Sequence, residues 1–125
     1  MIFKQIKCGG DRNFAYIIGD EDSRKAAFVD PAYNTKDICA RADDLELQVV
    51  YVINTHGHFD HSGGNSEVRE KTGAQVIAHE SAADADISAA DGDSVEMGSI
   101  TLEFIHTPGH TPDSMCVLAQ EHLCT

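Results

Sequence analysis

Basic side chains are scarce in this sequence. Lysine and arginine together number 9 against 21 aspartates and glutamates, which gives a formal net charge of −12 at pH 7 with the histidines neutral. So few cations cannot supply the broad positive surface that binds a nucleic acid backbone or an anionic membrane. We therefore expect neither a nucleic acid nor a membrane among the partners of this protein.

Long apolar runs are also missing. No segment approaches the roughly 20 consecutive apolar residues that a transmembrane helix needs. The first seven residues are too polar to form the apolar region of a secretory signal peptide. The sequence therefore predicts a cytoplasmic location.

Cysteine is present but scattered. The four cysteines form no CxxC pair and no closely spaced framework, which excludes a small domain built on disulfides. Four free thiols in a reducing compartment are the favoured interpretation, and two disulfide pairs are the alternative. The cysteines are Cys8, Cys39, Cys116 and Cys124. Cys116 alternates with apolar residues, so we expect it to be a small core side chain.

The hydrophobic content of 42% in 125 residues is enough for one domain with a packed core. Short apolar or alternating runs predict strands, and apolar residues at helical spacing predict two helices. The predicted strands cover residues 1–7, 14–18, 26–29, 49–53, 75–78, 94–97, 100–105 and 115–119. The predicted helices begin at Asn34 or Thr35 and at Asn65, and residues 80–86 are expected to form a helical turn. This order predicts an antiparallel meander followed by β-α-β units, in a mixed α/β fold with helices outside the sheet.

A cluster of metal-binding residue types follows the apolar run 49–53. His56, His58, Asp60 and His61 fall within six positions on a glycine-rich segment. Imidazole nitrogen and carboxylate oxygen are ligands for zinc and for iron. Residues two apart on an extended chain point the same way, so the first two histidines can converge on one ion. The alternative is a polar surface loop rich in histidine.

A second histidine stands in a rigid setting about fifty residues later. His110 lies between Pro108 and Pro112, beside Gly109, in a loop between two predicted strands. The prolines restrict the backbone and would hold the histidine in a defined position, as a metal ligand requires. The alternative is a plain turn with a surface histidine.

Together these motifs resemble those of the metallo-β-lactamase superfamily, and particularly its glyoxalase II-like hydrolases. Further similarities run along essentially the whole chain. They are residues 14–19, Val29-Asp30-Pro31, Gly63-Gly64-Asn65 and Asp91-Gly92-Asp93 before Gly98. The resemblance implies an αββα sandwich, of which residues 1–125 form one domain that is the N-terminal portion, with the C-terminal half absent.

The resemblance also implies the metal ligands. One ion would be held by His56, His58 and His110, and a second by Asp60 and His61. The family's later bridging aspartate and final histidine have no counterpart in this sequence. The implied cofactor is one or two zinc ions, with iron as the alternative.

The activity implied by the resemblance is metal-dependent hydrolysis of a thioester such as an S-acylglutathione, through a metal-bound hydroxide. Asp60 would orient that hydroxide or act as general base. One alternative is a mononuclear iron persulfide dioxygenase, with His56 and His110 among its ligands. Another is an inactive truncated module that binds metal or self-associates. Because half of the sandwich is missing, one face of the first sheet and the edge strand near Val117 would lack cover. We therefore expect either a homodimer through that face or a rearrangement of the last strand.

A few other polar residues have less specific expectations. His79 ends a predicted strand near the place where the loops gather. It is interpreted as a surface histidine, with a role behind the metal ligands or on the substrate side as the alternative, and His106 is interpreted as structural or solvated. Asp30-Pro31 is expected to shape a loop near the site. The acidic stretch 20–22 is expected to be a solvated hairpin tip.

Overall fold

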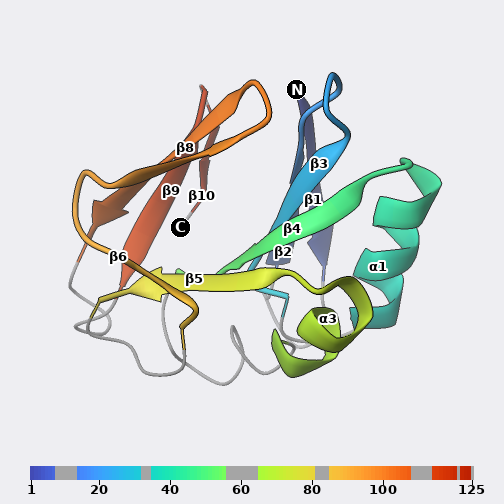
Figure 1. Cartoon of the computed structure of the whole chain (residues 1–125), viewed down its shortest axis with the longest axis horizontal. Helices are drawn as coiled ribbons and strands as arrows, with labels where there is room; N and C mark the ends of the chain where they lie inside the picture. Colours follow the sequence, from blue (N-terminus) through green and yellow to red (C-terminus); the bar gives the residue numbers. More distant parts are fainter. Residues whose placement is uncertain are drawn as a thin grey trace.

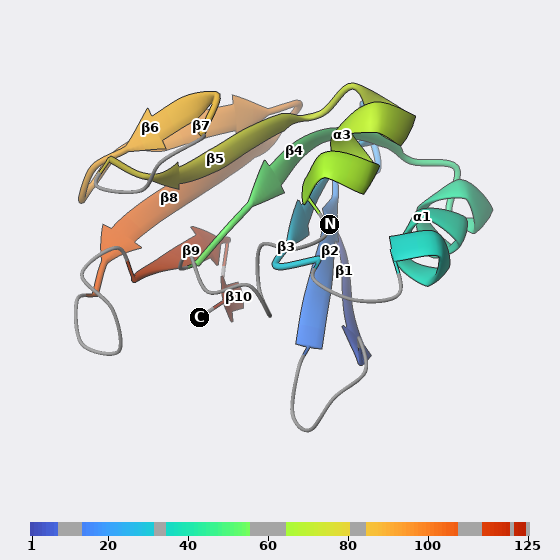
Figure 2. The same ribbon diagram turned by 90° about the horizontal axis from the view of Figure 1, so that it is seen from below.

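Two β-sheets and two helices make up three layers in the part of the chain that the structure describes (Figures 1 and 2). The structure is a computed structural model. It describes residues 1–7, 14–31, 35–55, 65–80, 85–107, 114–120 and 122–124. The helices cover one face of the larger sheet and the smaller sheet covers the other. This arrangement confirms the predicted mixed α/β fold with outer helices.

The larger sheet has six strands in the order β1-β2-β3-β4-β5-β6. They are β1 (Ile2–Lys7), β2 (Phe14–Gly19), β3 (Lys25–Val29), β4 (Gln48–Ile53), β5 (Gln75–His79) and β6 (Ile87–Ala89). The first three pair antiparallel, as the meander prediction requires, and β3 to β6 pair parallel. The three-residue β6 was not predicted, because so short a run carries no recognisable alternation. Residues 81–84 of the predicted helical turn lie outside the described residues.

The smaller sheet is antiparallel throughout, in the order β10-β9-β8-β7. Its strands are β7 (Ser94–Met97), β8 (Ile100–His106), β9 (Met115–Ala119) and β10 (His122–Cys124). Along β8, buried residues alternate with exposed ones from Ile100 to Phe104, which is the pattern of a strand with one face on the core. The expectation that the strand near Val117 forms the sheet edge is wrong, because β10 pairs with β9 on that side.

The two helices use small apolar stripes to cover the larger sheet. In α1 (Thr35–Asp44), Ile38 and Ala42 are buried one turn apart, and in α3 (Asn65–Thr72), Val68 is buried. Gly73 follows α3 with a φ of 71°, a left-handed conformation that glycine adopts without a Cβ penalty and that ends the helix. Neither of these helices is long and apolar enough to cross a membrane, within the part of the chain described.

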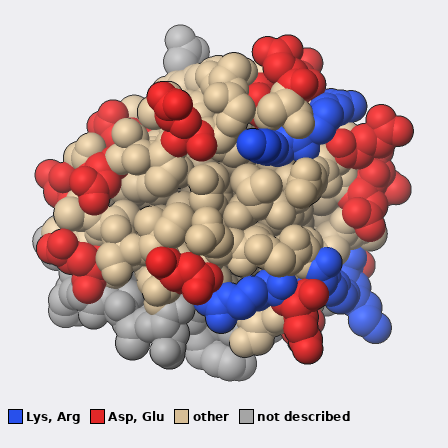
Figure 3. Space-filling view, viewed as in Figure 1, with Lys and Arg blue, Asp and Glu red and all other residues tan. Residues whose placement is uncertain are grey.

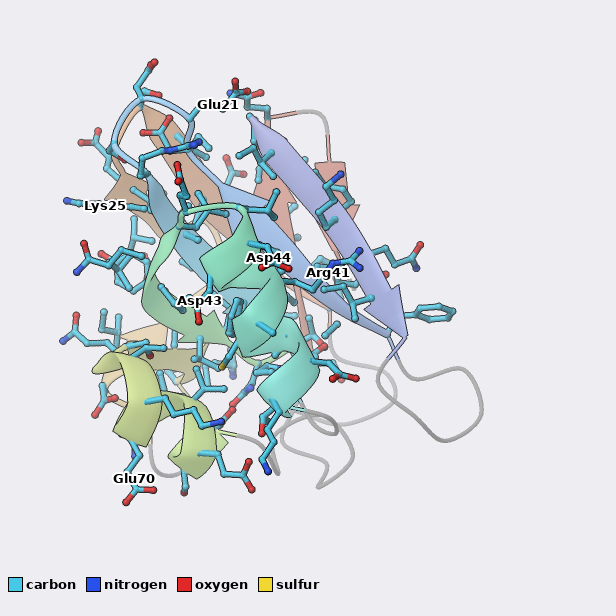
Figure 4. All side chains as sticks on the ribbon, turned by 90° about the vertical axis from the view of Figure 1, so that its right-hand side faces the viewer. Glu21, Lys25, Arg41, Asp43, Asp44 and Glu70 are labelled. Carbon is cyan, nitrogen blue, oxygen red and sulfur yellow. The ribbon has the colours of Figure 1, made fainter. Side chains whose placement is uncertain are left out.

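The outer face of the helices is charged. The side chains of Arg41, Asp43 and Asp44 of α1 and Glu70 of α3 are exposed (Figure 4). On the face drawn in Figure 3, lysine and arginine side chains are interspersed with aspartate and glutamate. The helix layer is therefore amphipathic, with its apolar side toward the sheet.

Two apolar cores result from this layering. One lies between the sheets and includes Ile18, Ile53, Phe104 and Val117. The other lies between the larger sheet and the helices and includes residues such as Phe28. The expectation that one face of the first sheet lacks cover is therefore wrong, because apolar side chains on both of its faces are packed. The homodimer predicted through that face is not tested and stays a prediction.

The described cysteines match the sequence interpretation. Cys39 and Cys116 are free thiols, and Cys116 is buried as predicted for a small core side chain. Cys8 and the side chain of Cys124 lie outside the described residues.

The interpretation of residues 20–22 as a solvated tip is wrong for Asp20. Its side chain is buried and accepts hydrogen bonds from the Ser23 hydroxyl at 2.6 Å and from the Ser99 hydroxyl at 2.6 Å. The Ser99 backbone N–H also donates to it at 2.9 Å. Because Ser99 lies in the turn between β7 and β8, the carboxylate ties the two sheets together. Only Glu21 and Asp22 of this stretch are exposed.

We expect Asp20 to make stability depend on acid pH. Hydrogen bonds from Ser23 and Ser99 hold the pKa of this carboxyl far below its usual value of 3.8. A lowered folded-state pKa contributes stability that is complete above about pH 4 and is lost as the pH falls toward the folded pKa. Asp20→Asn should lower the unfolding temperature by several degrees at pH 7 and flatten its decline between about pH 4 and pH 2.

The measurement is thermal unfolding followed by circular dichroism across that pH range. Asp22→Asn is the matched control, because its exposed side chain lies in the same turn. Parallel curves for wild type and Asp20→Asn would contradict the prediction.

Candidate metal centre

All five predicted ligands lie in two segments outside the described residues, 56–64 and 108–113. They are His56, His58, Asp60, His61 and His110. The structure does describe the chain ends from which both segments depart. Those ends lie at one edge of the molecule, where β4 and β5 end and β9 begins (Figures 1 and 2).

The first segment starts directly after β4, at a firmly held residue. The backbone N–H of Thr55 donates to Asp30 at 2.8 Å, and its hydroxyl donates to the other carboxylate oxygen at 2.5 Å. Asp30 is buried, directly follows β3 and has a φ of 53°. These bonds place Asp30 beside the residue that precedes His56, and the prediction that Asp30 shapes a loop near the site stays a prediction. The adjacent parallel strands β3 and β4 are therefore joined at their ends through Thr55, the residue that precedes His56.

The far end of the same segment is tied back to its start. Asn54 donates to Asn65 at 3.1 Å through its side-chain amide, and Asn65 donates in return at 2.7 Å. Asn54 is buried, and Asn65 is the first residue of α3. This reciprocal amide pair closes the segment 56–64 at its base. From the sequence, Asn65 was predicted only as the start of a helix and Asn54 was not singled out, although a polar residue after an apolar strand was a usable signal.

The second segment has an equally defined base. The N–H of Thr107 donates to the carbonyl of Ser114 at 2.9 Å, so the two ends of segment 108–113 are paired. The next residue, Met115, donates its N–H to the carbonyl of Thr55 at 2.7 Å. The smaller sheet is thereby bonded to the larger one. The two histidine-bearing segments therefore depart from adjacent points of the backbone.

Two further histidines meet at this edge. The rings of His79 and His106 stack, with their centroids 3.8 Å apart and their planes at 15°. His79 ends β5 and is buried, whereas His106 ends β8 and is half-buried. The interpretation of His79 as a surface histidine is therefore wrong, because the opposite sheet covers its ring. His106 was expected to be structural or solvated, and its stacking on His79 agrees with the structural role.

The donor set of the two segments has the chemistry of a divalent metal site. Four imidazoles and one carboxylate are the ligands that zinc and iron take in proteins. Within the described ranges, no group of three or more His, Cys, Asp or Glu side chains could hold a metal ion. The five candidate ligands stay a prediction from the sequence, and the structure shows only that the two segments that carry them start from neighbouring points of the backbone.

Comparison with known proteins defines the family. Residues 8–122 match the Metallo-beta-lactamase superfamily. The chain therefore belongs to the metallo-beta-lactamase superfamily.

Curated relatives within the superfamily include persulfide dioxygenases and hydroxyacylglutathione hydrolases. The chain is 36% identical over 124 residues to the human mitochondrial persulfide dioxygenase ETHE1, covering 97% of this chain and 47% of that protein. It is 38% identical over 123 residues to the hydroxyacylglutathione hydrolase of Polaromonas sp., covering 94% of this chain and 46% of the relative. This chain thus spans about half the length of these curated relatives, so it corresponds to their N-terminal part.

A solved structure has the same fold. ETHE1 from Myxococcus xanthus superposes with a TM-score of 0.90 at 33% identity, covering 98% of this chain and 56% of that one. The fold is therefore the metallo-beta-lactamase fold, in agreement with the resemblance seen in the sequence.

Proposed function

We propose that this chain is the metal-binding part of a hydrolase that cleaves a thioester such as an S-acylglutathione. The observation that carries the proposal is the hydrogen bond from Met115 to the Thr55 carbonyl, which brings the bases of segments 56–64 and 108–113 together. The identity to hydroxyacylglutathione hydrolases supports the substrate class.

The first metal would be held by His56, His58 and His110. Three protein ligands leave a fourth position open, which is the arrangement of catalytic rather than structural zinc sites. A bound divalent ion lowers the pKa of a coordinated water to about 7 and polarises a substrate carbonyl. Asp60 and His61 would hold a second ion more weakly, because two side chains are an incomplete set.

Residues of this chain would position the attacking water and accept its proton. Asp60 would orient the attacking water and accept its proton, a role that contributes about 10²–10⁴-fold to a rate. Asp30, through its bonds to Thr55, would fix the point from which His56 starts. Attack on the thioester carbonyl would break the C–S bond and release a carboxylic acid and a thiol.

A mononuclear iron persulfide dioxygenase is the second candidate. It is favoured by the identity to human ETHE1 and by the superposition on the ETHE1 of Myxococcus xanthus. On this alternative, His56 and His110 would be iron ligands. The carboxylate that completes such a two-histidine, one-carboxylate set has no counterpart in the motifs matched here.

Metal analysis and two activity assays separate these candidates. The purified chain would be loaded with zinc or, without oxygen, with ferrous iron. It would then be assayed for thiol release from an S-acylglutathione and for oxygen uptake on glutathione persulfide. Thiol release by the zinc form, lost in Asp60→Asn, is the expected result.

Oxygen uptake by the iron form without thiol release would favour the dioxygenase instead. Metal binding without either activity would mean that this chain is a metal-binding module without turnover.

A further inference from the structure

A stacked pair of histidine rings links the two sheets at the edge where the histidine-bearing segments depart. His79 contributes its ring from β5 of the larger sheet, and His106 contributes its ring from β8 of the smaller one. The centroid distance is 3.8 Å, so the rings are in van der Waals contact across their faces. This contact adds a side-chain link beside the backbone bond between Thr55 and Met115.

His79 is the more firmly held partner. Its backbone pairs with Ala89 in the parallel ladder of β5 and β6, and its exposed fraction is only 6%. It follows the buried residues Val76, Ile77 and Ala78 and is the first ionisable side chain after that run.

His106 stands at the start of the second segment. Its backbone N–H donates to Asp91 at 2.8 Å, so the turn before β7 holds it from one side. The next residue, Thr107, pairs with Ser114 across the base of segment 108–113. The ring of His79 holds His106 from the other sheet. A shift of His106 would therefore move the base of the segment that carries His110.

We propose that His79 is a positioning residue for His110. Through its ring it holds His106, and hence the start of segment 108–113, in a fixed place relative to Thr55 and the first histidine segment. This inference rests on the proposed metal site. A misplaced ligand lowers metal affinity even when the ligand itself is present, because outer contacts of metal sites affect affinity about 10–100-fold.

The test is zinc affinity, measured on the whole chain by competition with a chromophoric chelator. His79→Ala should weaken zinc binding about 10–100-fold. His79→Phe, which keeps a flat ring for stacking, should recover most of the loss. His106→Ala should weaken binding similarly, and the double variant should be no weaker than either single variant, because both remove one contact. The visible spectrum of the cobalt-loaded chain should change in His79→Ala and return in His79→Phe.

Val76→Ala is the matched control for loss of stability. Val76 is buried in the same strand but belongs to the core under the helices, so its truncation should lower the unfolding temperature without changing zinc affinity. An equal loss of affinity in Val76→Ala would overturn the proposal, as would unchanged affinity in His79→Ala, failure of His79→Phe to rescue, or additive losses in the double variant. A wild-type chain that binds no zinc would instead refute the metal site itself, and the inference with it.

Discussion

Replacing His110 with alanine is expected to weaken zinc binding by more than about 100-fold. Loss of an outer contact already costs about 10–100-fold, and this change removes a proposed ligand outright. His56→Ala should have an effect of the same size, because each histidine would supply one of three nitrogen donors to the same ion. Metal content after dialysis and chelator competition measure the loss.

His122→Ala is the control for these variants, since His122 lies outside both motifs. It should bind zinc as the wild type does. Circular dichroism should show that all three variants keep the secondary structure of the wild type. If His110→Ala retained wild-type affinity while His56→Ala lost it, the two segments would not share an ion.

Gly98→Ala is expected to destabilise the fold by about 2–5 kcal/mol. Gly98 has a φ of 63°, and an alanine in the left-handed region costs about 1–2 kcal/mol. A methyl group there would also overlap the Asp20 carboxylate and the Ser23 hydroxyl, and overpacking adds about 1–3 kcal/mol. Denaturant unfolding measures the change in the free energy of unfolding.

Gly92→Ala separates the two contributions. Gly92 has a φ of 84°, but a methyl group there would meet no atom within 4 Å. Its substitution should therefore cost only the backbone part, about 1–2 kcal/mol. Equal losses at the two glycines would mean that the approach of Asp20 to Gly98 contributes nothing.

Local patterns predicted most of the elements and few of their long-range partners. The apolar run of β4, the alternation of β8 and the spacing of Ile38 and Ala42 each depend on neighbours in sequence. The burial of Asp20 depends on Ser99, which is 79 residues away. The burial of His79 depends on the facing sheet, from which the His106 ring stacks on it. Neither partner can be inferred from the few residues around these positions.

For the candidate site, the sequence supplied the ligands and the structure supplied the places from which they depart. Donor types and spacing in segments 56–64 and 108–113 predicted a metal site, because coordination chemistry is tied to residue type. The closing contacts of Asn54 with Asn65 and of Met115 with Thr55 join residues from different elements. Their pairing follows from the packing of the sheets, which residue type alone does not specify.

The Asn54–Asn65 pair bears on the order in which folding and metal binding would take place. Bringing together the ends of a flexible loop has an entropic cost that grows with the logarithm of its length. Here the folding of β4 and α3 offsets that entropic cost for the nine residues of segment 56–64, because the Asn54–Asn65 hydrogen bonds hold the two ends together. On the proposed function, an arriving ion would then have only to arrange side chains of a segment whose ends already meet. This would differ from a zinc finger, whose chain folds only when the metal draws its ends together.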